Sequence, residues 1–361
     1  MDWRSFFYGC GFILILFLYV PIRVNKKHAS HHNFSVYMER YNKSYSNDTV
    51  YHHRYKNFMD ASRAVDKLNK MRQHNSSAIY GLSKFSDMSK DEFKDQYLQD
   101  DLPQRISGHK LNTFKGDSSE EVDVVRRRVN RRRHKRGTVT TAKSIPLKVD
   151  WRESGVVTKI NNQKSCGACW AFSTIQNMES MYAIKYQKLL KLSVQQAIDC
   201  ARYSNQGCDG GDDCTFLEWL HDYKVKVYSE EVYPLHLKTE VCKIANDSFY
   251  VQVDAFDCDS FIDQEEYILQ AIATIGPVAV AVNAISWQYY LGGVIQFNCG
   301  GDFDLLNHSV QLVGYDLTAE IPHYIARNSW GEDFGDKGYL YLAMGDNLCG
   351  LANEVSAMTV L

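Results

Sequence analysis

A cysteine, a histidine and an asparagine follow one another along the chain at spacings that suit nucleophilic catalysis. Cys169 ends the run Gln163-Lys-Ser-Cys-Gly-Ala-Cys169, His308 lies 139 residues beyond it, and Asn328 lies 159 residues beyond it. A thiol with an ordinary pKa near ~8.5 becomes a thiolate only beside an imidazolium or a helix N-terminus. The three residues therefore predict a hydrolase in which Cys169 attacks, His308 exchanges the proton and Asn328 orients the imidazole.

Two further residues could support this chemistry. The side chain of Gln163 and the backbone N–H of Cys169 could both donate to a developing oxyanion, and losing one such donor costs on the order of 3 kcal/mol. Trp330 could shield the bond between His308 and Asn328 from water. Apolar residues spaced by three and four over 169–186 predict a buried amphipathic helix whose positive end faces the sulfur.

Each of these residues also has an ordinary interpretation. Cys166 and Cys169 form a CxxC, which occurs in redox pairs and as half of a zinc site, but no βαβ pattern, second CxxC or close histidine pair accompanies it. We therefore expect no metal and no cofactor. His308 alone would be read as a core or surface histidine, and Asn328 alone as a turn residue. Their order after Gln163 and Cys169 favours catalysis.

The residues around Gln163, Cys169, His308 and Asn328 resemble the papain-like cysteine proteases (cathepsins), and the resemblance runs from about 34 to 361. The spacing fits or slightly exceeds the ~130–150 residues typical of that family. Segments 192–200 and 284–295 resemble its cathepsin O branch. The resemblance implies an α+β, two-domain fold: a helical domain over about 145–250, an antiparallel β-barrel-like domain over about 251–361, and the cleft between them.

The sequence itself supports the sheet-rich second domain. Short apolar or alternating runs at 276–282, 310–315 and 339–344 are bounded by Gly, Pro or Asp, as strands are.

The resemblance also implies a substrate site. Gly210 and Gly211 would present backbone groups to an extended substrate, while the pocket for the second residue before the cut would use Asp212, Asp213, Ala281, Leu306, Ser309 and, at its floor, Glu354, with Trp330 also lining the cleft. Carboxylates there would favour Arg or Lys alongside apolar residues. The alternative is that all three acids point to solvent, as acids usually do.

Ten cysteines are numerous for a cytosolic enzyme and suit an oxidising compartment. The family pattern implies disulfides between Cys166 and Cys208, between Cys200 and Cys242, and between Cys299 and Cys349. It does not explain Cys214 and Cys258, which could pair or stay buried as thiols.

The composition is that of a globular chain of 361 residues, 45% hydrophobic and 23% charged, which is long enough for two cores. Its net charge of −2 divides into +11 over residues 1–136 and −13 over 137–361. A basic segment that docks on an acidic enzyme suits an inhibitory propeptide.

The N-terminus predicts entry into the secretory pathway. An apolar run over 6–22 is followed by Arg23, Lys26 and Lys27, so residues 1–22 are a signal peptide or, if uncleaved, a signal anchor and the one membrane contact. Five plausible glycosylation sequons, at Asn33, Asn42, Asn47, Asn75 and Asn246, agree with a lysosomal or secreted protein.

Residues 23–136 resemble the family's propeptide. Its helical part, about 34–98, keeps Arg54, Phe58 and Asn69, has Val65, Val50 and Ala61 at divergent signature positions, and continues with Gly81, Ser83, Phe85 and Asp87. The linker 99–136 ends in a basic run over 126–136. Behind a signal sequence this run favours proteolytic cutting over nucleic-acid binding, with a proprotein convertase cutting after Arg136 to leave 137–361, or a protease cutting nearer Ile145.

The sequence therefore predicts a papain-like cysteine endopeptidase made as a zymogen, which forms an acyl-enzyme and serves lysosomal protein turnover. Its expected partners are protein and peptide substrates, its own propeptide and cystatin-type inhibitors. The alternative is a catalytically silent binding or inhibitory protein on the same fold, although the usual loss of the nucleophile or histidine is absent. No extra loop between Cys208 and Cys242 suggests an exopeptidase.

Overall fold

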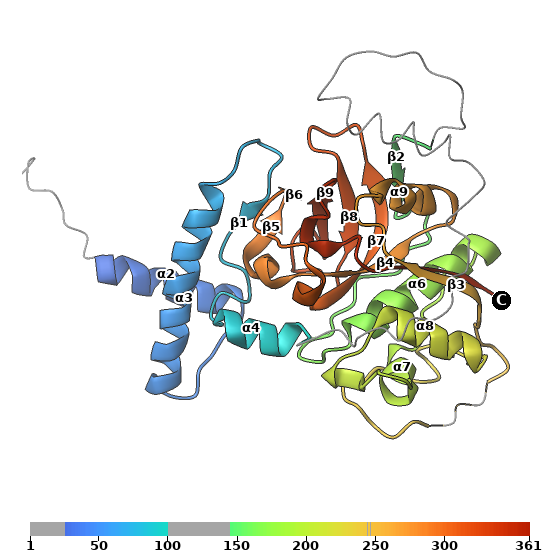
Figure 1. Ribbon diagram of the computed structural model, residues 1–361. Helices are drawn as coiled ribbons and strands as arrows, with labels where there is room; N and C mark the ends of the chain where they lie inside the picture. Colours follow the sequence, from blue (N-terminus) through green and yellow to red (C-terminus); the bar gives the residue numbers. More distant parts are fainter. Residues whose placement is uncertain (1–25, 100–144, 244, 246) are drawn as a thin grey trace, which may run out of the picture. The chain divides into compact units, whose positions relative to one another are not determined.

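The computed structural model describes residues 26–99 and 145–361, apart from 244 and 246 (Figure 1). The predicted signal segment, nearly all of the basic linker with its cleavage sites, and the sequon at Asn246 lie outside these residues. Within the described part of the chain, no helix is both long and apolar enough to cross a membrane. The chain divides into two compact units, residues 1–60 and 61–361.

The first unit contains helix α2 (Lys26–Arg40) and most of α3 (Asp48–Asn69). The helix α3 begins favourably, because the side chain of Asn47 accepts from the backbone N–H of Val50 and Asp48 lies in the first turn. Phe34 is fully buried, and its ring lies 5.0 Å from that of Phe58. Aromatic packing thus joins the two helices of this unit.

The second unit begins with the end of α3 and continues into strand β1 (Ile79–Tyr80) and helix α4 (Lys90–Tyr97). Asn69 fixes β1, because its side chain donates to Tyr80 O (2.7 Å) and accepts from Tyr80 N (3.0 Å). The helix α4 starts at a capping box formed by Ser89 and Glu92. The strand β1 pairs with β5 (Tyr290–Gly292) in a two-stranded antiparallel sheet of their own, separate from the large sheet.

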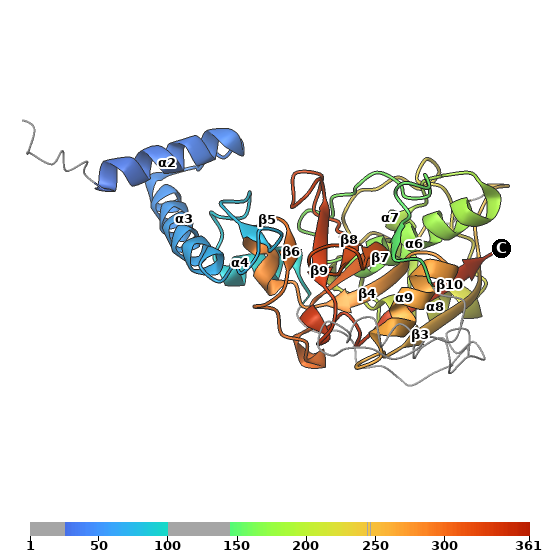
Figure 2. The same ribbon diagram turned by 90° about the horizontal axis from the view of Figure 1, so that it is seen from above.

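Helices α6 (Cys169–Tyr186), α7 (Val194–Cys200) and α8 (Asp213–Asp222) lie together in the lower part of the second unit in Figure 1, and Figure 2 shows the same helices from above. Both α7 and α8 contact α6. The predicted helix at 169–186 is confirmed, but it is not amphipathic over its first part. Every residue from Cys169 to Met181 is buried, since α7, α8 and the sheet strands β7 and β10 surround it. A helix at this position can hold its first residue rigidly.

The sheet contains β2 (Lys148–Asp150), β3 (Val253–Asp259), β4 (Val278–Val282), β6 (Val294–Ile295), β7 (His308–Asp316), β8 (His323–Arg327), β9 (Tyr339–Ala343) and β10 (Val355–Val360). Its order is β3-β10-β4-β7-β8-β9-β6, with β2 on β7; the β6–β9 pair is parallel and the others are antiparallel. The strands expected at 276–282, 310–315 and 339–344 are confirmed as β4, β7 and β9.

The second unit contains two large, separate clusters of buried apolar residues. One core lies among the strands and α9 (Glu265–Thr274), and the other lies among α6, α7 and α8. The ends of β3 and β10 belong to the helical core through Val253, Phe256, Met358 and Val360. The α+β fold class is confirmed, and the sheet stays open among the described strands.

Candidate active site

Cys169 is the first residue of α6 and the only free cysteine among the described residues. Its side chain is fully buried. The residue before it, Ala168, provides no side-chain cap, so the helix N-terminus and its partial positive charge face the sulfur without a competing side chain. The positive end of the helix lowers the free energy of a thiolate at Cys169, and this favours the thiolate when the side chain is accessible to water.

His308 begins β7, and Asn328 directly follows the end of β8. The ring nitrogen Nε2 lies 2.8 Å from Oδ1 of Asn328. Since a carbonyl oxygen only accepts, Nε2 carries the proton and Nδ1 has a free lone pair. Among the described residues Nδ1 has no hydrogen-bond partner, although it is buried. The tautomer is therefore the one that can take a proton through Nδ1.

Two tryptophans enclose this imidazole. The Trp330 ring lies 4.7 Å from that of His308 and tilts 33° from it, and the Trp287 ring lies 6.1 Å from it at an interplanar angle of 86°. Both indoles are fully buried. They exclude water from the His308–Asn328 bond, which strengthens that bond and holds the ring in one orientation.

Gln163 lies near His308 and Asn328, on the side of the site formed by the sheet, which is called the sheet wall here; the side formed by α6 and α8 is called the helical wall. Its side-chain oxygen accepts from the Ser329 hydroxyl (2.6 Å), which leaves Nε2 to donate to Cys166 O (3.0 Å) and more weakly to Tyr97 O (3.4 Å). A carbonyl oxygen of the N-terminal segment thus already lies near the nitrogen expected to bind an oxyanion.

The segment that follows α4 enters the site through Gln99. Its side-chain nitrogen donates to Cys169 Sγ (2.9 Å), its side-chain oxygen accepts from Gly211 N (2.7 Å), and its backbone N–H donates to Asn307 O (2.7 Å). The residue is buried. Gln99 therefore connects the helices to the sheet and holds a hydrogen bond to the thiol of Cys169.

Aromatic residues hold this segment on the sheet wall. Phe85, Phe93 and Tyr97 pack against Trp330, with ring separations of 5.7, 5.4 and 6.2 Å. Sequence reasoning missed both Tyr97 and Gln99, because a one-residue contact at the end of a helix has no periodic signal. The only available signal was Phe85 of the propeptide signature, which places the segment near the cleft.

Burial keeps both catalytic candidates uncharged in this form. It raises the pKa of Cys169 to about 12, and the nearby Asp213 carboxylate adds to the rise against hydrogen bonds from Gln99 and two backbone N–H groups. Burial also lowers the pKa of His308 to about 4, and the bond to Asn328 only partly opposes it. A neutral thiol is a weak nucleophile, so in this form of the chain Cys169 is poorly reactive.

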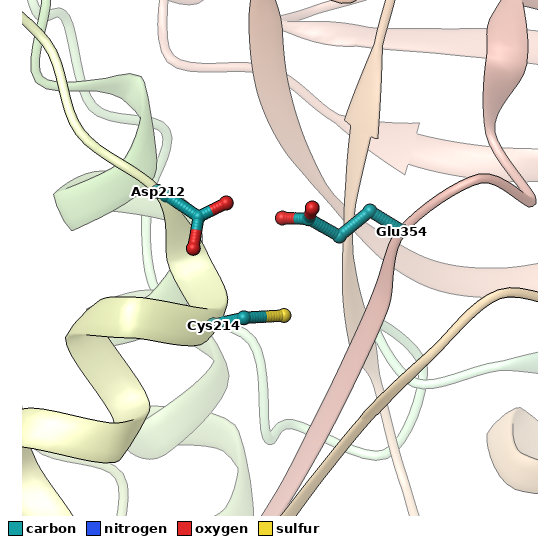
Figure 3. A group of neighbouring side chains, drawn as sticks. All are labelled: Asp212, Cys214 and Glu354. Carbon is teal, nitrogen blue, oxygen red and sulfur yellow. The ribbon is translucent and has the colours of Figure 1, made fainter. Parts of the chain in front are cut away.

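The three acids expected in the substrate pocket are all buried, so the alternative in which they point to solvent is wrong. Asp212, Asp213 and Glu354 expose 0%, 2% and 1% of their surface. The carboxylate of Asp212 faces that of Glu354 (Figure 3), and their oxygens and the Cys214 sulfur lie within 4.8 Å of one another. Asp212 Oδ1 accepts from Thr215 N (2.7 Å) at the start of α8, whereas Oδ2 has no hydrogen-bond partner among the described residues.

Asp213 turns away from this pair, toward α6 and β7. Its carboxylate accepts from the hydroxyls of Ser173, Thr174 and Ser309. The adjacent acids Asp212 and Asp213 thus have different surroundings, which their types and order could not indicate.

The other pocket candidates lie on the sheet wall or beside α8. Ala281 and Leu306 form a small buried apolar cluster, and Ser309 pairs with Ala281 across β4 and β7. Gly211 has a steric reason to be glycine, because a Cβ there would lie 2.6 Å from the Trp170 ring. Gly210 adopts a φ of +124°, which disfavours other residues.

Four disulfides crosslink the described residues. They join Cys166 to Cys208, Cys200 to Cys242, Cys299 to Cys349, and Cys214 to Cys258. The last pair is the one that the family pattern left open, and it ties α8 to β3. Because Cys214 is oxidised, it is no thiolate ligand for a metal beside Asp212 and Glu354.

Comparisons with known proteins agree with this geometry. Residues 145–359 match the papain family cysteine proteases, and residues 34–93 match the cathepsin propeptide inhibitor domain (I29). Cathepsin O of Homo sapiens is 38% identical over 79% of this chain and 81% of its own length, and that of Mus musculus is 35% identical over 81% and 86%.

Solved structures show the same likeness. The digestive procathepsin L 3 of Tenebrio molitor larval midgut matches with a TM-score of 0.73 at 27% identity, covering 91% of this chain and 99% of its own. The recombinant stem bromelain precursor matches with a TM-score of 0.74 at 28% identity, covering 92% and 99%. The chain belongs to the papain family of cysteine proteases, and it carries the propeptide of a zymogen.

Proposed function

We propose that this zymogen is a cathepsin O-like endopeptidase in which Cys169 is the nucleophile, His308 the acid and base, and Asn328 the residue that orients the imidazole. The observation that carries the assignment is the free thiol at the start of α6 together with a histidine whose Nε2 is fixed by Asn328 and whose Nδ1 is open.

The proposed reaction follows from these positions. Once the propeptide has left, His308 Nδ1 takes the thiol proton, and the thiolate attacks the carbonyl carbon of the substrate. Gln163 Nε2 and the backbone N–H of Cys169 donate to the oxyanion as it forms. The imidazolium then protonates the leaving amine, and water, deprotonated by the imidazole, hydrolyses the acyl-enzyme.

Labelling of the thiol tests this assignment. Full-length proenzyme is acid-treated, reacted with a thiol-directed epoxide and mapped by mass spectrometry, with Cys169→Ser as the control. A single adduct on Cys169, appearing only after the propeptide is lost, supports the assignment. Folded, fully processed protein that takes no label would overturn it.

We further propose that the pocket for the second residue before the cut accepts Arg or Lys. The support is the position of Asp212 and Glu354, whose buried carboxylates face each other (Figure 3) and would both accept hydrogen bonds from a guanidinium or ammonium group. The apolar neighbours Ala281 and Leu306 would contact the aliphatic part of such a side chain.

Peptide pairs that differ only in Arg or Leu at this position measure the preference. In Glu354→Gln the ratio of kcat/KM for Arg over Leu should fall roughly 30-fold, because removing one partner of a buried charge pair costs about 2 kcal/mol or more. Asp212→Asn removes the second carboxylate and should lower the same ratio. Asparagine also caps a helix N-terminus, so this variant keeps the start of α8 intact. An unchanged ratio in both variants would end this proposal.

The working protease is favoured over the silent binding protein, because the family match covers the whole catalytic region. We propose a lysosomal or secreted site of action, with a proprotein convertase for maturation and cystatin-type proteins as inhibitors. The sequon residues Asn33, Asn42, Asn47 and Asn75 are exposed, which supports passage through the secretory pathway. Peptide mapping of secreted protein before and after glycosidase treatment tests this route; unmodified asparagines at all four sites would count against it.

A further inference from the structure

A single buried carboxyl group connects the two walls of the proposed site. Asp213 is the first residue of α8, and its oxygen Oδ1 accepts from Ser173 and Thr174 of α6, while Oδ2 accepts from Ser309 of β7. The helix α6 begins at the proposed nucleophile, and Ser309 directly follows His308. Asp213 thus contacts both elements that carry the catalytic pair, without belonging to that pair.

The hydroxyls around Asp213 have a second set of acceptors. Ser173 Oγ lies 3.0 Å from Trp170 O, and Ser309 Oγ lies 3.3 Å from Val280 O and 2.9 Å from Ser173 Oγ. When the carboxylate is ionised, all three hydroxyls can donate to it. When it is protonated, it can donate to one hydroxyl, which then turns its own proton to a carbonyl. The hydrogen bonding is therefore complete in either protonation state.

Acidic and titratable groups lie on the elements that pack around Asp213, and two of them, Cys169 and Asp212, interact with it electrostatically. These groups are Cys169 on α6, Asp212 at the start of α8, His308 on β7, and Glu354 before β10, which lies within 4.8 Å of Asp212. Within the described ranges no Lys or Arg forms an ion pair with Asp213. Burial raises the pKa of Asp213 to about 7, Asp212 adds to the rise, and the hydroxyls oppose it.

The charge on Asp213 acts on the thiol. Ionised Asp213 raises the pKa of Cys169, whereas the pKa of His308 is set by burial and Asn328. A negative charge here therefore disfavours the thiolate without an equal gain for the imidazolium, and removing that charge favours the reactive ion pair.

We propose that Asp213 is a positioning residue that joins the nucleophile helix to β7, and that it gains a proton as the medium becomes acidic, which removes a negative charge beside Cys169. The inference rests on the proposed function, because it takes Cys169 as the nucleophile. Protonation of Asp213 would make Cys169 more reactive under acidic conditions. Asp213 would do so as a positioning residue, outside the catalytic pair.

The pH profile of processed enzyme, obtained from full-length proenzyme, tests the inference. Both kcat/KM and the rate at which iodoacetamide labels Cys169 should decline in the wild type as pH rises through about 7. In Asp213→Asn, which keeps the hydrogen bonding of the protonated acid, this decline should move up by at least about one pH unit. A decline at the same pH in both proteins would overturn the inference.

Thr174→Val provides a second variant with a predicted direction. It removes one hydroxyl that stabilises the ionised carboxyl, so the decline should move to higher pH than in the wild type. A merely structural role would lower activity at every pH and leave the midpoint unchanged, and that result would also overturn the inference.

Thermal unfolding gives a readout that needs no activity. The pKa of Asp213 rises from 3.8 when unfolded to about 7 when folded, so the folded state binds more protons between these values. Stability should therefore fall as pH rises through that window, and the fall should be smaller in Asp213→Asn. Wild-type protein that takes no thiol label would count against the proposed function; labelled protein with unchanged pH behaviour in Asp213→Asn would overturn this inference alone.

Discussion

The two walls of the site differ in where their stabilising groups come from. On the sheet wall, His308 is fixed by Asn328 and Trp330, which remain after any maturation. On the helical wall, Cys169 accepts a hydrogen bond from Gln99, which lies six residues beyond the segment that matches the propeptide inhibitor domain. The imidazole is therefore already oriented in this form of the chain, whereas the surroundings of the thiol depend on the segment that follows α4. We expect activation to be mainly an electrostatic event at Cys169, because water would replace the segment whose burial of the thiol raises its pKa.

The largest effect on activity should come from removing the residue of the sheet wall that fixes His308. In Asn328→Ala the imidazole loses the acceptor that fixes its tautomer and orientation, so kcat in processed enzyme should fall about 10²–10⁴-fold. Titration with the thiol-directed epoxide should still find one reactive Cys169 per molecule. A loss of less than tenfold would mean that Trp330 and Trp287 alone orient the ring.

A smaller effect should come from the temporary contact on the helical wall. Gln99→Ala removes two side-chain hydrogen bonds, each with a net contribution of about 0.5–1.5 kcal/mol, so iodoacetamide should label Cys169 about tenfold faster or more in uncleaved proenzyme. The rate is read by mass mapping at neutral pH, before any cleavage.

Gln96→Ala is the control for this measurement, because Gln96 is an exposed glutamine on α4, three residues away. Its labelling rate should match that of the wild type. Equal rates in the two variants would show that Gln99 does not restrain the thiol, and the contrast between the walls would then lose its main support.

These contacts mark how far the sequence could lead. Local pattern was enough for the strands β4, β7 and β9 and for a helix beginning at Cys169, because apolar periodicity and turn residues are local signals. Local pattern could not predict that this helix is buried on all sides, because its burial depends on elements distant in sequence.

The acids and the propeptide contacts show the same limit. Asp212 and Asp213 are neighbours with the same side chain, yet one faces Glu354 and the other faces three hydroxyls. Only the tertiary packing of α8 against α6 and the sheet decides which direction each takes. The Cys214–Cys258 pairing depends on the same packing, as does the contact of Gln99 with the thiol.

The smallest effect should come from the edge of the sheet wall, where Lys84 bridges to Asp333 and donates to Trp330 O. The Asp333 side chain is 59% exposed, and partly exposed ion pairs contribute about 0.2–1 kcal/mol. In uncleaved Lys84→Met proenzyme, Cys169 should therefore be labelled at most about fivefold faster, and the gap to the wild type should shrink at high salt, which screens the pair. An increase in labelling rate as large as that of Gln99→Ala, and insensitive to salt, would show that the propeptide is held mainly at the sheet wall. The propeptide would then act by covering Trp330, and its contact with the thiol would be secondary.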